Sequence, residues 1–208
     1  MERTHFETVR LSATIGGVLW IGAVPVLLNS LDRDSFDTIT WTAFGLSCVL
    51  LIVGLLGLHA QQADRMPLLG PAGLFVCVLA LVLLPLVLFF FHIVALLLAV
   101  GAAVYGIATI RARVLPRGGA WLLTLGGLPF PTVGLVHILG YSVALALCNI
   151  EQEFDRTLTP SELRCMDRVD LVEGWLLIGF AAAFGLGVIW LAWGRERSGT
   201  DSSTVPRS

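Results

Sequence analysis

The chain contains little charge and no lysine. Only 13% of its 208 residues are charged, whereas about a quarter are charged in an ordinary soluble domain. All 13 basic residues are arginines, and a net charge of −2 argues against nucleic acid as a partner. The chain is 56% hydrophobic with a mean hydropathy of +0.86, which is typical of a membrane domain.

Several patterns that mark enzymes and pumps are also missing. The sequence has no HExxH, no phosphate loop, no CxxC pair and no Ser/His/Asp order. No Asp, Glu or Arg falls inside the membrane spans expected below, which removes the commonest mark of an ion-coupled transporter. An enzyme is therefore the weaker functional class.

The 44 residues from Pro67 to Ile110 contain no charged side chain. A single helix of this length would measure about 66 Å, roughly twice the ~30 Å hydrocarbon core of a bilayer. We therefore expect two spans that fold back on each other through a tight turn near Phe89 to His92. Pro85 is expected to bend the end of the first of them.

The whole sequence predicts an all-α fold, an integral membrane bundle of six transmembrane helices. The expected spans are about 11–28, 41–59, 67–88, 92–110, 120–147 and 174–193. The first run is longer than a signal-peptide core of about 7–15 residues, so we expect it to be retained. Pro129 and Pro131 should kink the fifth span. Residues 148–170 are expected to form an exported segment, and 194–208 a disordered cytoplasmic tail.

Arginine placement predicts which side the termini occupy. With six spans, nine arginines lie on the face that carries both termini and four on the other, while ten of the 15 acidic residues lie opposite. The positive-inside rule then places both termini in the cytoplasm of a cell membrane, which we expect to be a bacterial plasma membrane. The alternative is five spans, which would put Arg111 to Arg117 beside the acidic loop 31–40.

Small residues recur at four-residue spacing in several spans. Examples are Ala13 with Gly17 and Ala183 with Gly187. Such pairs let helices approach closely, so they favour a compact bundle.

The exported segment contains a clear helix start. In Thr159-Pro160-Ser161-Glu162, Thr is a favourable N-cap, Pro suits the first helical position and Glu closes a capping box. We expect a short external helix from about Pro160 that runs toward the last span. It is either a lid over the span ends or a binding surface for an extracellular partner.

Two of the four cysteines, Cys148 and Cys165, lie in the exported segment. Thiols outside a plasma membrane tend to oxidise, and this pair would close a loop of about 17 residues, worth roughly 3 kcal/mol. The pair is a disulfide candidate, and two unpaired cysteines are the alternative. Cys48 and Cys77 lie within spans and are expected to be packing residues.

Two histidines are candidate cofactor ligands. His92 lies at the outer turn after the third span, and His137 lies about 24 Å along the fifth span from Trp121, so the expected topology brings both to the outer layer. Imidazoles there are possible ligands for haem or a metal ion. The alternative is structural, because Tyr141 shares a face with His137 and can hydrogen bond to it.

The turns after the second and fourth spans carry a resemblance. Gly57-Leu-His-Ala-Gln-Gln-Ala63 and Gly106-Ile-Ala-Thr-Ile-Arg-Ala-Arg-Val-Leu-Pro-Arg117 resemble the cytoplasmic turns of a loose group of uncharacterised bacterial multi-pass membrane proteins. That group has Gly-Leu-Tyr-Ala-Arg-Gln-Ala and Arg-Ala-Arg-Val-Phe-Pro-Arg at these places. Gln61 departs from the pattern, which usually has Arg. The resemblance implies the same topology and brings no activity.

Arg111, Arg113 and Arg117 are expected to be cytoplasmic anchors that meet anionic headgroups, or to dock a soluble partner. The first functional hypothesis is thus a non-catalytic bundle in the lipid bilayer that binds a lipid or a membrane or extracellular protein partner. The second is a transporter or channel through the kinked fifth span, and the third a haem or metal protein. The transporter would use polar residues of that span, namely Thr124, Thr132, His137, Tyr141 and Ser142.

Overall fold

The computed structural model describes residues 2–31, 38–66, 68–86, 91–113, 115–127 and 159–194, and within them the chain is helical with no strand. The expected all-α fold is confirmed for these residues. The elements are α1 (Glu2–Leu31), α2 (Thr38–Ala60), the short 3-10 helix η1 (Ala63–Arg65), α3 (Leu69–Leu83), α4 (Phe91–Ala112), α5 (Arg117–Gly127) and α8 (Pro160–Trp193).

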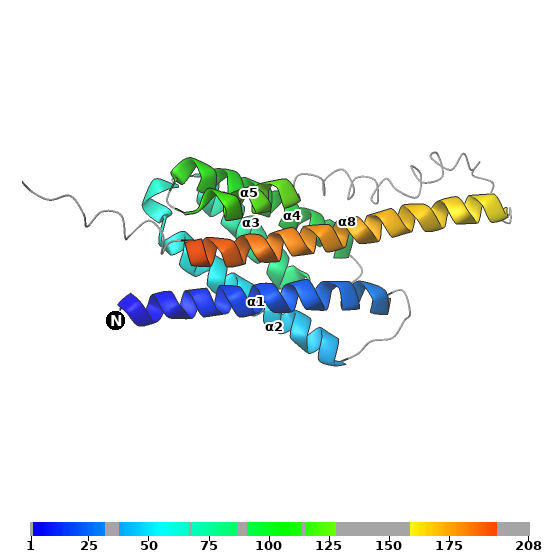
Figure 1. Cartoon of the computed structure of the whole chain (residues 1–208), viewed down its shortest axis with the longest axis horizontal. Helices are drawn as coiled ribbons and strands as arrows, with labels where there is room; N and C mark the ends of the chain where they lie inside the picture. The colour runs from blue at the N-terminus through cyan, green and yellow to red at the C-terminus, as the bar shows by residue number, and fades with distance from the viewer. Residues whose placement is uncertain are drawn as a thin grey trace, which may run out of the picture.

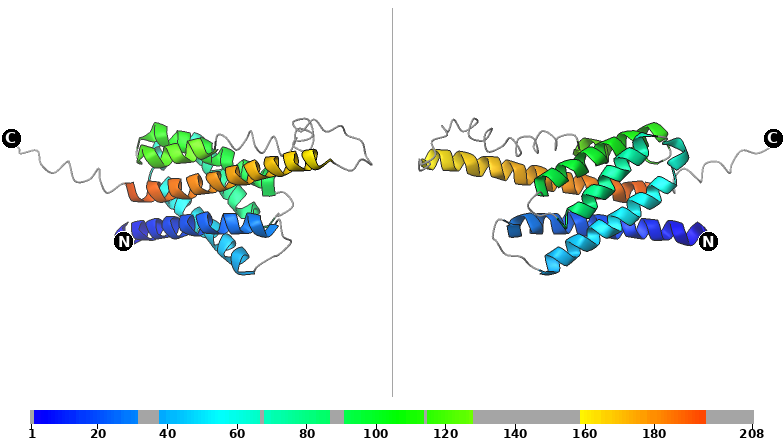
Figure 2. Two further views of the ribbon diagram at one scale, coloured as in Figure 1. Left: turned by 45° about the vertical axis from the view of Figure 1, so that its right-hand side comes forward. Right: turned by 180° about the vertical axis from the view of Figure 1, so that it is seen from behind.

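These six α-helices pack in a closed ring. Each helix contacts the next along the chain, and α8 contacts both α5 and α1, which closes the ring. Figures 1 and 2 show α8 running lengthwise between α1 and α5. The start of α1 and the end of α8 lie at the same end of the bundle (Figure 1).

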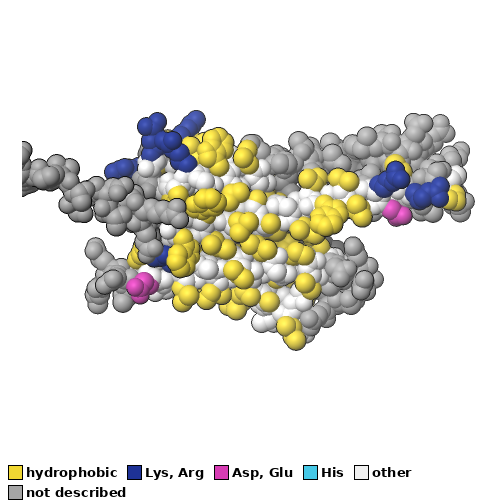
Figure 3. All heavy atoms as spheres, in the orientation of Figure 1, with side chains coloured by type: hydrophobic (Ala, Val, Ile, Leu, Met, Phe, Trp, Pro, Cys, Tyr) yellow, Lys and Arg dark blue, Asp and Glu magenta, His cyan; other side chains and the backbone are white. Residues whose placement is uncertain are grey.

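Four of the helices are long and apolar enough to cross a membrane. They are Phe6–Leu28, Thr38–Ala60, Ile93–Ala112 and Gly174–Trp193, and α3 is a shorter apolar helix of 15 residues. Many of their large apolar side chains point outward and are exposed. Charged side chains gather toward the two ends of the molecule, with hydrophobic surface between them (Figure 3). Such a surface suits a lipid bilayer, so the protein is a membrane protein.

The uncharged stretch folds back on itself, as expected. A Cβ placed on Gly73 would lie 2.6 Å from the backbone nitrogen of Tyr105, and one on Gly101 would lie 2.8 Å from that of Cys77. α3 and α4 are therefore antiparallel neighbours. α3 ends at Leu83, earlier than the expected 67–88, because Pro85 has no N–H to continue the helical ladder.

α5 differs from the expected fifth span, 120–147, at its start. α5 begins at Arg117 and contains the glycine pair Gly118-Gly119. A Cβ on Gly119 would lie 2.9 Å from the carbonyl oxygen of Gly187 on α8. The glycines therefore serve helix packing, and Pro116 directly precedes the first turn, where its fixed φ is tolerated. Residues 128–158, including Pro129 and Pro131, lie outside the described part.

α8 is one continuous helix of 34 residues, about 51 Å long. It begins at Pro160, where the capping pattern predicted a helix start, and it continues directly into the apolar segment Gly174–Trp193. A helix of this length exceeds the ~30 Å hydrocarbon core by about 20 Å. In Figure 1 its first turns extend past the other described helices.

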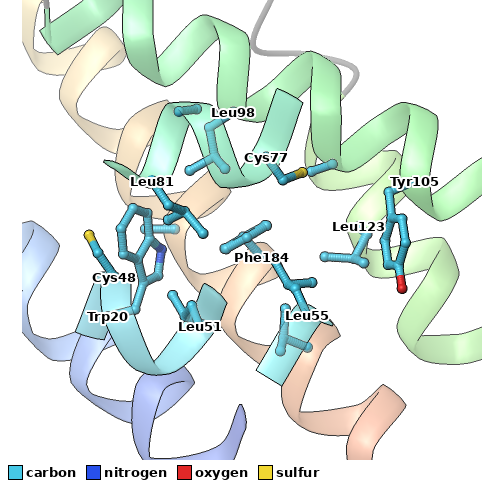
Figure 4. Packing of buried hydrophobic residues seen from close by; sticks show 14 of the residues in the cluster. Trp20, Cys48, Leu51, Leu55, Cys77, Leu81, Leu98, Tyr105, Leu123 and Phe184 are labelled. Carbon is cyan, nitrogen blue, oxygen red and sulfur yellow. The ribbon is translucent and has the colours of Figure 1, made fainter. Parts of the chain in front are cut away.

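Aromatic rings fill the centre of the ring of helices. Trp20 of α1 stacks on Phe44 of α2 with ring centroids 5.5 Å apart, and its ring lies 5.8 Å from Phe184 of α8. Figure 4 shows Trp20 and Phe184 among leucines of neighbouring helices. The core thus joins the first two helices to α8, the last described helix.

Glycine contacts set how closely α1 and α2 approach. A Cβ on Gly54 would lie 2.9 Å from the Cα of Ala13, a backbone atom that cannot rotate away. We predict that Gly54→Ala destabilises the protein by roughly 1–3 kcal/mol, because the two helices must separate. The measurement is the unfolding midpoint in a mild detergent titrated with sodium dodecyl sulfate.

Gly45→Ala is the matched control on the same helix, because a Cβ there would meet no atom within 4 Å. The control should unfold at or above the wild-type midpoint, since alanine is the better helix former. Equal losses in both variants would contradict a close contact at Gly54.

Candidate functional site

One end of the bundle, here called the basic end, collects arginines. It consists of the start of α1, the turn between α2 and α3, the turn between α4 and α5, and the end of α8. Its exposed arginines are Arg65, Arg111, Arg113 and Arg117. Basic side chains gather there in Figure 3.

Side-chain contacts between α1 and α8 stabilise this end. The Arg10 guanidinium lies 4.1 Å from the centroid of the Trp193 ring, within cation–π range. Trp193 Nε1 donates a hydrogen bond of 2.8 Å to Thr14 Oγ1, which donates in turn to the Arg10 carbonyl at 2.7 Å. The first and last described helices are therefore fixed to each other by directional contacts.

A buried hydrogen bond connects the α2–α3 turn to helix α4. Gln62 Nε2 donates to the Tyr105 hydroxyl at 2.9 Å, and these side chains are only 2% and 1% exposed. Gln62 follows α2, whereas Tyr105 lies on α4, 43 residues later. The bond therefore connects the α2–α3 turn to the helix that leads into the α4–α5 turn. Figure 4 shows the Tyr105 ring beside the core leucine Leu123.

Two polar atoms beside this bond have no hydrogen-bond partner among the described residues. They are the Oε1 atom of Gln62 and the Nδ1 atom of His59, and both are buried. The His59 ring centroid lies 6.1 Å from that of Tyr105. The three side chains thus form a small polar cluster in the apolar interior of the basic end. It can accept and donate hydrogen bonds.

The α4–α5 turn, residues 111–117 and here called the basic turn, presents three arginines to the surface. Arg113 has a φ of 56°, a left-handed conformation that only a few per cent of non-glycine residues adopt. Leu115 is buried and fixes the turn against the bundle. The sequence has no acidic residue between Asp64 and Glu151. The basic turn therefore carries no acidic neighbour in sequence to neutralise its arginines.

An apolar groove lies along the seam between α5 and α8. Its volume is about 350 Å³. It is called the α5–α8 groove here, and it is lined by Leu122, Leu125, Gly126, Trp175, Leu176, Gly179, Phe180 and Ala183. On α5 the lining begins five residues after Arg117, about 7 Å along the helix. On α8 the lining runs from Trp175 to Ala183, and Gly126 faces Ala183, so most of the groove lies toward the end of the bundle opposite the basic turn.

The predicted cofactor ligands lie outside what the structure describes. His137 is beyond the described residues, and of His92 only the backbone position on α4 is described. Among the described residues no group of three His, Cys, Asp or Glu side chains lies together as a metal site would require. The proposal of a haem or metal site at these histidines stays a prediction.

One predicted pathway residue, Thr124, is described. It is 4% exposed, and its Oγ1 donates to the Ala120 carbonyl at 2.9 Å. A Cβ on Gly106 would lie 2.9 Å from the Thr124 backbone nitrogen. Thr124 of α5 therefore packs against α4. The other predicted pathway residues, Thr132, His137, Tyr141 and Ser142, lie outside the described residues.

The cysteines separate into two groups. Cys48 and Cys77 are buried free thiols in the helix core, in the packing positions that their places within spans suggested. Cys165 is half-buried on α8 and is not one of these free cysteines. Its expected partner, Cys148, lies outside the described residues, so the disulfide stays a prediction.

No protein-family model matches the chain, and the comparisons with curated proteins and with solved structures found no match. No activity is therefore carried over from a relative. The resemblance of the two turns to a loose group of membrane proteins stays an expectation.

Sequence reasoning missed the polar cluster, although signals for it were present. Tyr105 is the only tyrosine in the uncharged stretch, and a buried tyrosine hydroxyl usually has a hydrogen-bond partner. Gln62 and Tyr105 also lie in or beside the two turns that carry the resemblance. What the sequence lacked was evidence that these turns meet, because nothing in a polar turn identifies its partner 43 residues away.

We predict that Gln62 and Tyr105 are energetically coupled. Gln62→Leu and Tyr105→Phe should each cost roughly 1–3 kcal/mol, because each leaves the other buried polar group without its partner. The double variant should lose less than the sum by at least about 0.5 kcal/mol, measured as a double-mutant cycle of unfolding in detergent. Simple additivity would contradict a shared hydrogen bond.

We also predict a disulfide between Cys148 and Cys165. Protein purified without reductant and unfolded in detergent should take up two alkylating groups, at Cys48 and Cys77, and four after reduction. Intact mass spectrometry counts the groups. Cys148→Ser should expose Cys165 to alkylation without reduction, and four groups on the unreduced wild type would disprove the bond.

Proposed function

We propose that the protein is a non-catalytic bundle of six membrane helices, with both termini in the cytoplasm, that binds membrane lipid through its basic end. The observation that carries the proposal is the basic turn, which places three exposed arginines at the end of an apolar belt. Anionic headgroups of a cytoplasmic leaflet attract such arginines at about 1 kcal/mol each.

A contact between the two ends of the described chain supports the proposed number of crossings. Arg10 near the start of α1 contacts Trp193 at the end of α8. This contact supports an even number of crossings between them, and the closed ring supports six. α3 measures about 22 Å, and together with the turn after it approaches the thickness of the hydrocarbon core. The positive-inside rule then assigns the basic end to the cytoplasm.

Binding without catalysis is the function that the polar groups support best. The buried Gln62 joins the α2–α3 turn to α4, and Thr124 joins turns within α5. These bonds serve packing. The arginines of the basic turn lie at the surface, where they meet headgroups rather than a closed reaction site.

Reporter fusions made in a bacterial host test the proposed topology. Green fluorescent protein fused after Ser208 should fluoresce, and alkaline phosphatase fused there should be inactive, because the carboxyl terminus is cytoplasmic. A protease site inserted after Asp34 should be cleaved from outside in spheroplasts. An active phosphatase at Ser208 would overturn the six-span arrangement and would favour the five-span alternative.

A further inference from the structure

The polar cluster of His59, Gln62 and Tyr105 contains more hydrogen-bonding groups than its members satisfy among themselves. Gln62 Nε2 donates to the Tyr105 hydroxyl, but Gln62 Oε1 and His59 Nδ1 are buried and have no partner among the described residues. Buried polar atoms in native proteins nearly always have a protein or water partner. We propose that the cluster is a binding site for one ordered water molecule. This water site is independent of lipid binding at the basic end.

The three side chains lie close enough to share one small partner. The backbone N–H of Gln62 donates to the His59 carbonyl at 2.9 Å, so these two residues belong to the same turn. The Gln62 amide reaches the Tyr105 hydroxyl at 2.9 Å, and the ring centroids of His59 and Tyr105 are 6.1 Å apart. Two hydrogen bonds to one water oxygen span up to about 6 Å. One water can therefore connect the end of α2 to α4.

A water molecule matches the kind and the number of the remaining groups. Gln62 Oε1 is an acceptor, and His59 Nδ1 is an acceptor when the ring carries its proton on Nε2. The Tyr105 hydroxyl accepts the amide proton of Gln62, so its own hydrogen can be donated. The water then donates to Gln62 Oε1 and His59 Nδ1 and accepts from Tyr105. Three hydrogen bonds are typical of a buried water.

Either orientation of the Gln62 amide leaves a polar group for this water. If the amide is turned by 180°, its oxygen accepts from the Tyr105 hydroxyl, and its N–H groups take the place of Oε1 as the buried groups that need a partner. The water then accepts from the amide instead of donating to it. The need for one shared partner does not change.

The surroundings of the cluster suit a small guest that enters from the nearby surface. Gln62 and Tyr105 are almost fully buried, and the apolar side chains of Leu58 and Met66 beside them in sequence are buried as well. His59 is half-buried at the last turn of α2, with its Nδ1 atom on the buried side. The site is therefore enclosed by apolar groups but lies close to the basic end, where water is available.

The distribution of charge favours a neutral guest over a cation. At the basic end the described acidic side chains, Glu7 and Asp64, are both exposed, and α3, α4 and α5 contain no acidic residue. A buried cation without a negative partner is costly, whereas a water molecule needs only hydrogen bonds. Water is the neutral molecule that supplies two donors and an acceptor in the smallest volume.

Radiolytic hydroxyl-radical footprinting tests for this water, because radicals formed from a bound water oxidise the side chains that contact it. The sample is the full-length protein in mild detergent, and mass spectrometry of its peptides gives the oxidation rate of each side chain. Tyr105 is as deeply buried as Phe44 and Phe184 of the apolar core. We expect Tyr105 to be oxidised severalfold faster than either phenylalanine. Equal background rates at all three side chains would overturn the proposal.

Variants show whether oxidation of Tyr105 depends on the cluster. His59→Phe keeps an aromatic ring and the Gln62–Tyr105 bond but removes the Nδ1 acceptor, and Gln62→Leu removes the amide. Each should lower the rate at Tyr105 to that of the core phenylalanines. Gln61→Leu is the matched control, because it removes the same group from the neighbouring half-buried residue and should leave the rate unchanged. A rate that stays high in folded His59→Phe, or that falls equally in Gln61→Leu, would rule out this site.

A salt series separates water from a bound cation. The unfolding midpoint in detergent is measured in sodium, potassium, ammonium and choline chloride at one ionic strength. A cation that binds the folded protein raises the midpoint as its concentration rises. We expect equal midpoints in the four salts. A rise that is specific to one small cation and is lost in His59→Phe would overturn the assignment to water.

Discussion

Close contact between helix backbones is the constraint on which the rest of the structure depends. Lipid chains are as apolar as leucine, so helices in a bilayer are held together by van der Waals packing rather than by a hydrophobic drive. At each main crossing a glycine meets backbone atoms of the neighbour, as Gly54 meets Ala13, Gly73 meets Tyr105 and Gly119 meets Gly187. These contacts close the ring of helices. They also bring α5 against α8, which creates the seam that holds the groove.

Polar side chains inside the bundle serve mainly to fix the ends of helices. Gln62 bonds to Tyr105 across two turns, and Trp193 bonds to Thr14 between the first and last described helices. An unmet hydrogen bond is costly where no water is present, so these contacts hold each helix end in one register. This fixed end then presents the exposed arginines at the surface.

The two ends of the molecule differ in how their helices are held. Side-chain bonds fix the helices at the basic end. At the other end the first turns of α8, from Pro160, extend beyond the other described helices. The extended part of α8 offers a separate surface on the opposite side, where the expected disulfide at Cys165 would restrain it.

Sequence alone determined the fold class, the fold-back of the stretch after Pro67 and the start of α8 at Pro160, because apolar length, missing charge and a capping pattern are local properties. It placed the fifth span from about residue 120, and the structure adds that the helix itself begins at Arg117, where its glycine pair packs on α8. It predicted the arginines of the basic turn as headgroup anchors but could not predict the groove between α5 and α8. The Gln62–Tyr105 bond and the α5–α8 seam were decided by the tertiary structure, because each depends on residues far apart in the chain that meet only when the ring closes.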